Sequence, residues 1–263
     1  MINQETMSGL RKWFRDYVKL FYSKNPEDQR NIDLKEEHTR QVCRWILDIG
    51  ESLGLSNEEL SLAEVMALFH DIGRFEQYAR YGTYSDLRSE DHATLGVRVL
   101  REKGVLNCLD LQTRELILRT ISYHNRFDLP KDETEKCLFY TKLLRDADKM
   151  DIWRVVTGYY GQKNGQKNGT IELGLPDTPE ISDEVYNSLV KKNIVKMGSL
   201  KTLNDFKVLQ MGWVFDVNFP RTFDLIREKG YLQMIRDALP PSDRLTEISS
   251  MVQSYLEKHC SAA

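Results

Sequence analysis

The stretch ALFHDIGR, residues Ala67–Arg74, places an imidazole and a carboxylate side by side at the end of an apolar run. The pair stands where the core pattern of the chain is strongest, at the end of a segment that is predicted to be helical. Titratable groups are costly to bury without a charged or hydrogen-bonded partner. His70 and Asp71 are therefore either a satisfied structural pair or ligands of a metal ion, and other parts of the chain must distinguish these two interpretations.

The composition is that of an ordinary globular protein. The chain has 263 residues, of which 41% are hydrophobic and 29% are charged, so it is long enough to bury a sizeable core. Its formal net charge of −3 provides no general attraction to nucleic acid or to an anionic membrane. We therefore expect neither a membrane nor nucleic acid in general as a partner, while the sequence leaves a homo-oligomer open.

The cysteines and the N-terminal residues predict a cytoplasmic protein. The four cysteines are scattered without a CxxC pair, and we expect them to be reduced thiols that are mostly buried. The first residues, MINQETMSGLRKWFRDY, lack the apolar segment of a signal peptide. No apolar run approaches the length of a membrane span.

Apolar residues recur at helical spacing through most of the chain, and no convincing alternating strand appears. Ser56 together with Glu59 has the signature of a capping box, and Ser89 is a candidate N-cap. We therefore predict an all-α fold. Its helices are expected at about residues 6–23, 33–54, 56–73, 89–104, 111–125 and 133–156.

The prediction divides the chain into four parts. An N-terminal helix (1–29) should pack on a helical core (30–160), which is followed by a polar loop rich in Gly and Asn (161–181). The loop contains a doubled GQKN whose lysines could cover a nearby site, although a solvated loop is the simpler interpretation. The final part (182–263) returns to helical spacing, and we expect its helices to pack on the core as part of the same domain.

Four of the five histidines fall one per predicted helix, each on or beside an apolar face. A single histidine in that position is usually a satisfied core residue, but four are harder to explain in this way. Side chains from facing helices of a bundle can converge on one point, which is a common way to build a metal site. The four are His38, His70, His92 and His124, whereas His259 lies in the C-terminal tail and is expected to take no part.

The order of His38, the HDIGR segment and RDADKMD resembles the HD superfamily of metal-dependent phosphohydrolases, whose pattern is H…HD…D. The resemblance extends from about residue 30 to residue 155 and implies an HD-type helical bundle with additional C-terminal helices. His92 and His124 resemble the extra histidines of the subgroup that has a second metal position. After His124 the chain reads NRFDLP and lacks the GYP signature of cyclic-dinucleotide phosphodiesterases, so the resemblance does not extend to that specificity.

The resemblance also implies ligands for one or two divalent ions, and mixed nitrogen and oxygen donors suit Mn, Fe, Mg, Co or Ni. The first ion would be held by His38, His70, Asp71 and Asp148. His92 and His124 would hold a second ion; with a single ion bound, they would instead contact the substrate phosphate or protonate the leaving oxygen. The groups expected to be catalytic are accordingly Asp71, His92 and His124.

Asp148 competes with Asp146 for the last ligand position. On a helix Asp148 shares a face with Tyr140 and Leu144, an apolar stripe that points inward, so we predict that Asp148 is the ligand. Asp151, three residues further on, is a candidate to support the ligands from behind.

Basic residues beside these motifs are candidates to bind phosphate. Arg74 follows the HD pair, Lys149 follows Asp148 and Arg126 follows His124, although each could equally be an exposed charge or part of an ion pair. Three tyrosines between Arg74 and His92 could stack on a base or belong to ordinary loop packing. The predicted substrate is therefore a small phosphate ester, with a nucleotide as the first choice.

Three functions fit these patterns. The leading hypothesis is hydrolysis of a phosphomonoester or phosphodiester by metal-activated water. A di-iron oxygenase of the same helical arrangement is a second, because the same ligands suit that chemistry. A non-catalytic sensor or scaffold that binds metal and nucleotide is a third. The completeness of the ligand set favours the hydrolase.

Overall fold

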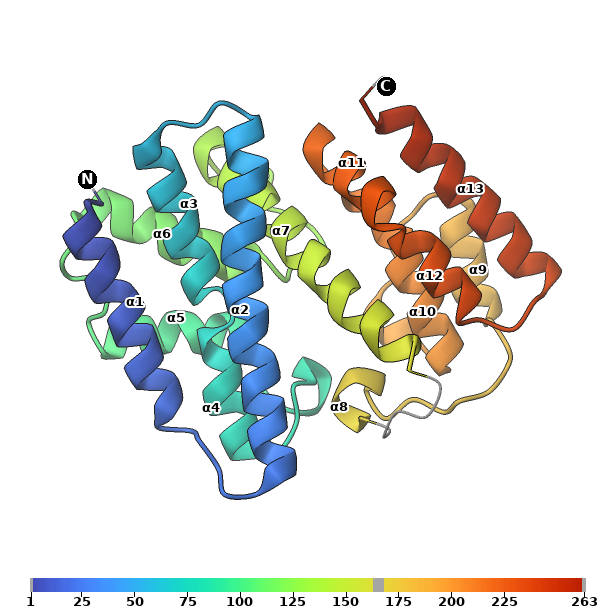
Figure 1. Ribbon diagram of the computed structural model, residues 1–263, viewed down its shortest axis with the longest axis horizontal. Helices are drawn as coiled ribbons and strands as arrows, with labels where there is room; N and C mark the ends of the chain where they lie inside the picture. The colour runs from blue at the N-terminus through green and yellow to red at the C-terminus, as the bar shows by residue number, and fades with distance from the viewer. Residues whose placement is uncertain (1, 163–167, 262–263) are drawn as a thin grey trace. The chain divides into compact units, whose positions relative to one another are not determined.

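The chain is helical throughout the part that the structure describes. The computed structural model covers residues 2–162 and 168–261, and no strand occurs among them, which confirms the all-α prediction. Figure 1 shows the arrangement of the helices. The first seven are α1 (Gln4–Lys19), α2 (Pro26–Ser52), α3 (Asn57–Phe69), α4 (Ile72–Tyr81), α5 (His92–Glu102), α6 (Leu111–Tyr123) and α7 (Glu135–Tyr160).

Shorter helices follow α7, and the chain divides into two compact units, Met1–Asp151 and Ile152–Ala263. A 3-10 turn, η1 (Asp86–Arg88), lies between α4 and α5. The elements after α7 are α8 (Gly169–Glu172), α9 (Asp183–Val190), η2 (Met197–Ser199), α10 (Leu203–Gly212), η3 (Trp213–Asp216), α11 (Pro220–Lys229), α12 (Tyr231–Asp237) and α13 (Asp243–His259).

The core of the first unit is organised around α3. This helix contacts α2, α1 and α6, and its residues 62–69 are all buried. A helix that is covered on every side cannot be amphipathic, which explains why its apolar run is nearly continuous. The end of α3 therefore delivers His70 and Asp71 directly into the interior, where both side chains are buried.

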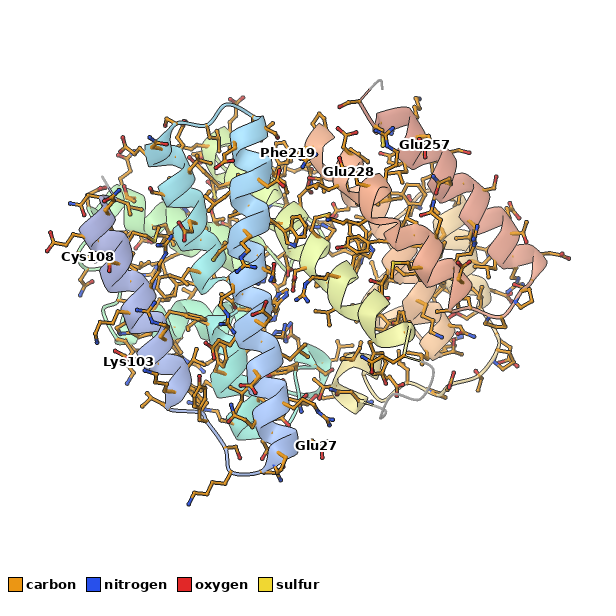
Figure 2. The ribbon with its side chains drawn as sticks, viewed as in Figure 1. Glu27, Lys103, Cys108, Phe219, Glu228 and Glu257 are labelled. Carbon is orange, nitrogen blue, oxygen red and sulfur yellow. The ribbon has the colours of Figure 1, made fainter. Side chains whose placement is uncertain are left out.

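The helix that carries His38 is longer than its apolar spacing predicts. α2 begins at Pro26, because the Asn25 side chain accepts hydrogen bonds from the backbone N–H groups of Glu27 and Asp28. Proline suits the first helical position, since its missing N–H would have no partner there. Figure 2 labels Glu27 in this first turn. The earlier start places His38 near the middle of a 27-residue helix.

The predicted helix at 56–73 consists of two helices. α3 begins with the capping box of Ser56 and Glu59, as predicted, but it ends at Phe69 and α4 begins at Ile72. Asp71, between them, has φ −103° and ψ 14°, close to the sparsely populated bridge region. Consecutive side chains of a continuous helix point about 100° apart. The break allows the neighbours His70 and Asp71 to serve one centre.

The start of α5 also differs from the prediction. Asp91 rather than Ser89 is the N-cap, because the Asp91 side chain accepts the hydrogen bond from the backbone N–H of Thr94. The hydroxyl of Ser89 instead donates to the carbonyl of Ser85 and accepts from Gln77. His92 is consequently the first residue of the helix.

Gly73 permits the close approach of α4 and α5. A Cβ atom at this position would lie 2.3 Å from the carbonyl oxygen of His92 and 2.6 Å from the backbone nitrogen of Gly96. Only glycine fits such a contact, because backbone atoms cannot move aside as the end of a side chain can. The approach brings the start of α5, and with it His92, beside the HD pair.

We expect Gly73→Ala to destabilise the protein by about 1–3 kcal/mol, because the added methyl group forces the two helices apart. Gly9→Ala on α1 is the matched control, since nothing lies within 4 Å of its added Cβ. This control should leave the free energy of unfolding unchanged or raise it slightly. Urea denaturation of both variants is the measurement, and an unchanged midpoint for Gly73→Ala would contradict the close approach.

The second unit is built around α10, whose residues are all buried and which contacts α9, α12 and α13. The indole N–H of Trp153 donates to the carbonyl of Gln210 at 2.9 Å, and Trp213 packs against Trp153. Phe215 contacts the ring of Tyr255. These aromatic residues therefore belong to the packing of this unit. Its helical content agrees with the prediction, whereas membership of the same domain as the core stays a prediction.

Three expectations about the surface can be compared with the structure. Both lysines of the doubled GQKN lie within 163–167, outside the described residues, so the prediction of a covering loop is not addressed. None of the described helices has the length and apolar character needed to cross a membrane. The cysteines are free thiols, but the expectation that most are buried is wrong: Cys137 is buried, Cys43 and Cys260 are half-buried, and Cys108 is exposed.

Candidate metal centre

Four donor atoms from three segments of the first unit converge on one point. His38 comes from the middle of α2, Asp148 from α7, and His70 and Asp71 from the break between α3 and α4. The Nε2 atom of His38 lies 3.1 Å from Oδ1 of Asp148 and 3.3 Å from Nε2 of His70. Oδ2 of Asp71 lies 3.5 Å and 3.6 Å from these two nitrogens.

These separations are those of atoms that share one ion. Donors bound at about 2.1 Å lie about 3.0 Å apart at right angles and about 3.4 Å apart in a tetrahedron. The four donors therefore need little movement to surround a cation. Of the predicted first ligand set, His38, His70 and Asp71 form one group of donors, whereas Asp148 groups with His70 and His124 and lies 3.1 Å from His38.

A second group of donors adjoins the first through Asp71. Oδ1 of Asp71 lies 3.3 Å from Nε2 of His92, and Nε2 of His92 lies 3.1 Å from Nε2 of His124. His92 begins α5, and His124 follows the last residue of α6. The two oxygens of Asp71 thus face two adjacent positions, so this carboxylate is suited to bridge a pair of ions.

The far nitrogen of each histidine is held by the protein. Nδ1 of His38 lies 2.7 Å from Oδ2 of Asp151, and Nδ1 of His92 lies 2.7 Å from Oδ2 of Asp86. Nδ1 of His70 and of His124 lie 2.7 Å from backbone carbonyl oxygens of their own helices. All four acceptors place the proton on Nδ1, which leaves Nε2 directed into the centre as a potential ligand.

The second group has the donor set of a cation site. Burial, and the histidines His92 and His70 beside it, lower the pKa of His124 to about 3. Burial and Arg74 lower the pKa of His92, against the opposing effect of Asp86. Both rings are therefore neutral at pH 7, with their single protons committed at Nδ1. Two bare nitrogens and a carboxylate oxygen then face one another without a proton, and a divalent cation satisfies all three.

The first group differs from the second because carboxylates contact its histidine His38. Burial and Lys35 disfavour a proton on His38, but the carboxylates of Asp148 and Asp151 outweigh them and raise the pKa of His38 to about 9. Burial disfavours the ionised form of Asp71, yet nearby groups, with Lys35 foremost among them, hold its pKa well below the usual range. Asp71 is thus an ionised ligand, while His38 carries a proton where the metal would bind.

Arg74 makes its polar contacts within the protein. Its guanidinium donates to Oδ1 of Asp86 at 2.8 Å, to Oε1 of Gln77 at 2.9 Å and to the carbonyl of Tyr84. Asp86 in turn accepts a hydrogen bond from Nδ1 of His92. Arg74 therefore holds in place the η1 residue that orients this predicted ligand. The Nε atom of Arg74 lies 3.5 Å from Oδ1 of Asp71, and a role of Arg74 in substrate binding stays a prediction.

The other predicted substrate-binding residues differ in exposure. Lys149 is buried beside Asp148 on α7. Arg126 is exposed and lies over the ring of Tyr123, with 4.7 Å between guanidinium carbon and ring centroid. Two of the three tyrosines between Arg74 and His92 are used in packing: the Tyr84 hydroxyl donates to the carbonyl of Asn31, and the Tyr78 hydroxyl to Asp28. The rings of these two tyrosines are therefore committed to α2.

Two residues of the centre were not predicted from the sequence. Lys35 donates from Nζ to Oδ2 of Asp71 at 2.7 Å, and its position one helical turn before His38 is a signal that could have identified it. Asp86 orients His92, but it lies six residues earlier in a non-periodic segment, where no spacing indicates the contact. Asp151, expected to support the ligands, contacts His38 in that way.

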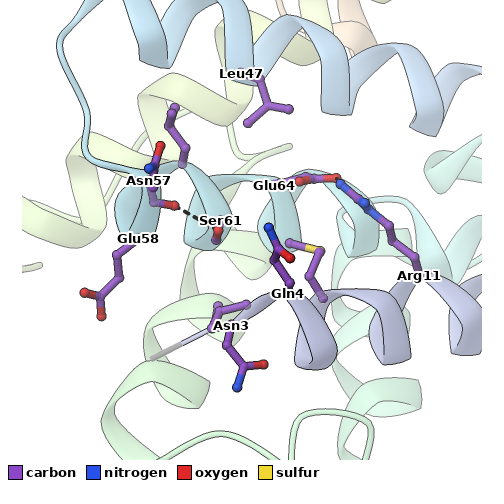
Figure 3. A pocket seen from close by; sticks show the side chains of 11 residues that line it. Asn3, Gln4, Arg11, Leu47, Asn57, Glu58, Ser61 and Glu64 are labelled. Carbon is purple, nitrogen blue, oxygen red and sulfur yellow. Dashed lines mark hydrogen bonds and ion pairs between the residues drawn. The ribbon is translucent and has the colours of Figure 1, made fainter.

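A pocket elsewhere in the first unit is separate from the centre. It has a volume of about 860 Å³ and is lined by residues of α1, α2 and α3 (Figure 3). An ion pair between Arg11 and Glu64 lies at its edge, and the Ser61 hydroxyl donates to the carbonyl of Asn57. Its lining includes none of the six predicted ligands.

Comparison with protein families agrees with the geometry. Residues 36–153 match the family model of the HD domain. This match supports the HD superfamily of metal-dependent phosphohydrolases, and the matched segment contains all six predicted ligands. No curated protein and no solved structure matches the chain.

Proposed function

We propose that this protein is a metal-dependent phosphohydrolase that binds two divalent ions and cleaves a small phosphate ester. The observation that carries the proposal is the position of Asp71, whose two oxygens face two adjacent groups of donors. Bound divalent ions supply an activated water and stabilise the negative charge that develops on phosphorus. The chain's own residues hold those ions and shape the approach of the ester.

The geometry supports a ligand role for His92 and His124 rather than a role as general acid. Each presents only Nε2 to the centre, because Nδ1 is bonded to Asp86 or to the carbonyl of Ile121. A general acid must carry a proton near neutral pH, whereas the pKa of His124 is lowered to about 3. We therefore assign His92 and His124, together with Asp71, to the second metal position.

We retain a nucleotide as the first substrate to test. The tyrosines that suggested base stacking give it limited support, because Tyr84 and Tyr78 are packed on α2 while Tyr81 is exposed. Arg74, Arg126 and Lys149 stay candidate phosphate contacts. A panel of nucleoside mono-, di- and triphosphates with p-nitrophenyl phosphate and bis-p-nitrophenyl phosphate would separate monoesterase from diesterase activity.

The proposal predicts ester hydrolysis that depends on added Mn²⁺ or Fe²⁺ and is abolished by a chelator. His70→Ala should lower kcat by at least about a hundredfold, because the first position loses one of its four donors. His259→Ala, in the C-terminal helix, is the control and should retain activity. Full activity of His70→Ala, or activity unaffected by metal removal, would refute the assignment.

Oxidation of a substrate at a di-iron centre is the second candidate function. It is favoured by a specific observation: four histidines and a carboxylate placed between two positions suit iron as well as they suit other divalent ions. Oxygen consumption by anaerobically iron-loaded protein would support it. Hydrolysis that is equally fast with a redox-inert ion and without oxygen would support the phosphohydrolase, and metal and nucleotide binding without turnover would indicate a sensor or scaffold.

A further inference from the structure

Lys35 places a positive charge at the carboxylate shared by the two metal positions. It lies one turn before His38 on α2, so both side chains are on the same face of that helix. Its ammonium donates to Oδ2 of Asp71 at 2.7 Å and lies 5.5 Å from the centroid of the Tyr84 ring. Tyr84 is itself held by its bond to Asn31, so the lysine is positioned against a fixed ring.

The exposure of the side chains shows where solvent reaches the centre. The side chains of His38, His70, Asp71 and His92 are between 0 and 4% exposed. Asp148 is 19% exposed and Lys35 is 17% exposed. An incoming ligand therefore meets the first metal position on the side where Lys35 and Asp148 lie.

The ammonium of Lys35 suits an anionic ligand that approaches the first metal position. An ammonium has three N–H donors, and among the described residues that of Lys35 donates to one acceptor, Asp71. Arg74, another cation near Asp71, has its Nε 3.5 Å from Oδ1 of Asp71 and also donates to Asp86, Gln77 and the carbonyl of Tyr84. The guanidinium of Arg74 thus has several acceptors that hold the η1 segment in place, whereas the ammonium of Lys35 has Asp71.

We propose that Lys35 is the substrate-binding cation of this centre and donates a hydrogen bond to a phosphoryl oxygen of the bound ester. The inference rests on the proposed function, because it assigns a phosphoryl group to the metal positions. Lys35 keeps one contact with Asp71 and directs its remaining donors toward the ligand. Its ammonium is already held between Asp71 and the Tyr84 ring, which limits the rotamer entropy lost when the ligand binds.

Inorganic phosphate is the probe, because its binding to metal-loaded protein is independent of turnover. Isothermal titration of the full chain should show that Lys35→Met weakens phosphate binding about tenfold or more, as loss of a charged hydrogen bond does. Lys35→Arg, which retains the charge, should bind within severalfold of the wild type. The matched control is Lys12→Met, since Lys12 forms an exposed lysine–aspartate pair with Asp16 on α1; it should bind phosphate like the wild type.

Metal content, measured by elemental analysis on the same samples, distinguishes binding of phosphate from simple neutralisation of Asp71. Unchanged phosphate affinity in Lys35→Met, with or without altered metal content, would overturn the inference, as would a metal-loaded wild type that binds no phosphate. Phosphate binding that depends on Lys35 in a protein that hydrolyses no ester would support the inference and refute the proposed function. Ester hydrolysis in a protein whose phosphate binding does not depend on Lys35 would support the proposed function and refute the inference about Lys35.

Discussion

Replacement of Asp71 by alanine is expected to lower phosphohydrolase activity at least about a thousandfold, the largest effect of any single substitution in the centre. The physical reason is that its two oxygens face different positions: Oδ2 lies 3.5 Å from Nε2 of His38, and Oδ1 lies 3.3 Å from Nε2 of His92. One substitution therefore removes a ligand from both positions. His70→Ala removes a ligand from the first alone.

Elemental analysis and steady-state kinetics are the measurements for Asp71→Ala. Metal content should fall for both positions, from two ions per chain toward none. Asp132→Ala, which removes an exposed carboxylate, is the control and should keep both ions and full activity. The shared-carboxylate geometry would be contradicted if Asp71→Ala retained one tightly bound ion at wild-type affinity. Circular dichroism would verify that the variant is folded, so that loss of metal is not loss of structure.

The second large effect concerns pH. We expect metal affinity at the first position to rise about tenfold per pH unit between pH 6.5 and about pH 9, while affinity at the second position changes little. His38 has a pKa of about 9 in the metal-free protein, so an ion must displace its proton at lower pH. The pKa of His124 is lowered to about 3 and that of His92 is also lowered, so these ligands are already deprotonated.

Competition with a metal-binding dye across this pH range measures the two affinities. His124→Ala isolates the first position, and His38→Ala isolates the second. A pH slope of the same size for both variants would contradict the difference in protonation. A flat profile for the first position would show that His38 is neutral in the metal-free protein, against the influence of Asp148 and Asp151.

The same proton makes the stability of metal-free protein depend on pH in a definite direction. The folded-state pKa of His38 is raised above 6.5, so its stabilisation is fully present below about pH 6.5 and is lost as pH rises through about 9. The melting temperature of chelator-treated protein should therefore fall over this range. Metal-loaded protein should not show this fall, because the ion replaces the proton on His38.

The sequence alone was sufficient for the fold class and for the six side chains that converge. Apolar residues at helical spacing report burial directly, since each apolar face must be covered by another helix. Histidines on such faces stand out because buried titratable groups need partners. Helical periodicity also selected Asp148, whose oxygen lies 3.1 Å from Nε2 of His38.

Only the tertiary structure decided which of these residues contact one another. The break between α3 and α4 and the contact at Gly73 are set by packing, so the sequence pattern suggested one continuous helix. Asp86 contacts His92 from a non-periodic segment, so periodicity carries no information about that contact. The position of Lys35 one turn before His38 indicates its helix face, but not its bond to Asp71. The bridging position of Asp71 depends on distances between elements distant in the chain. Local spacing determines which side chains face inward, but tertiary packing alone determines which atoms meet there.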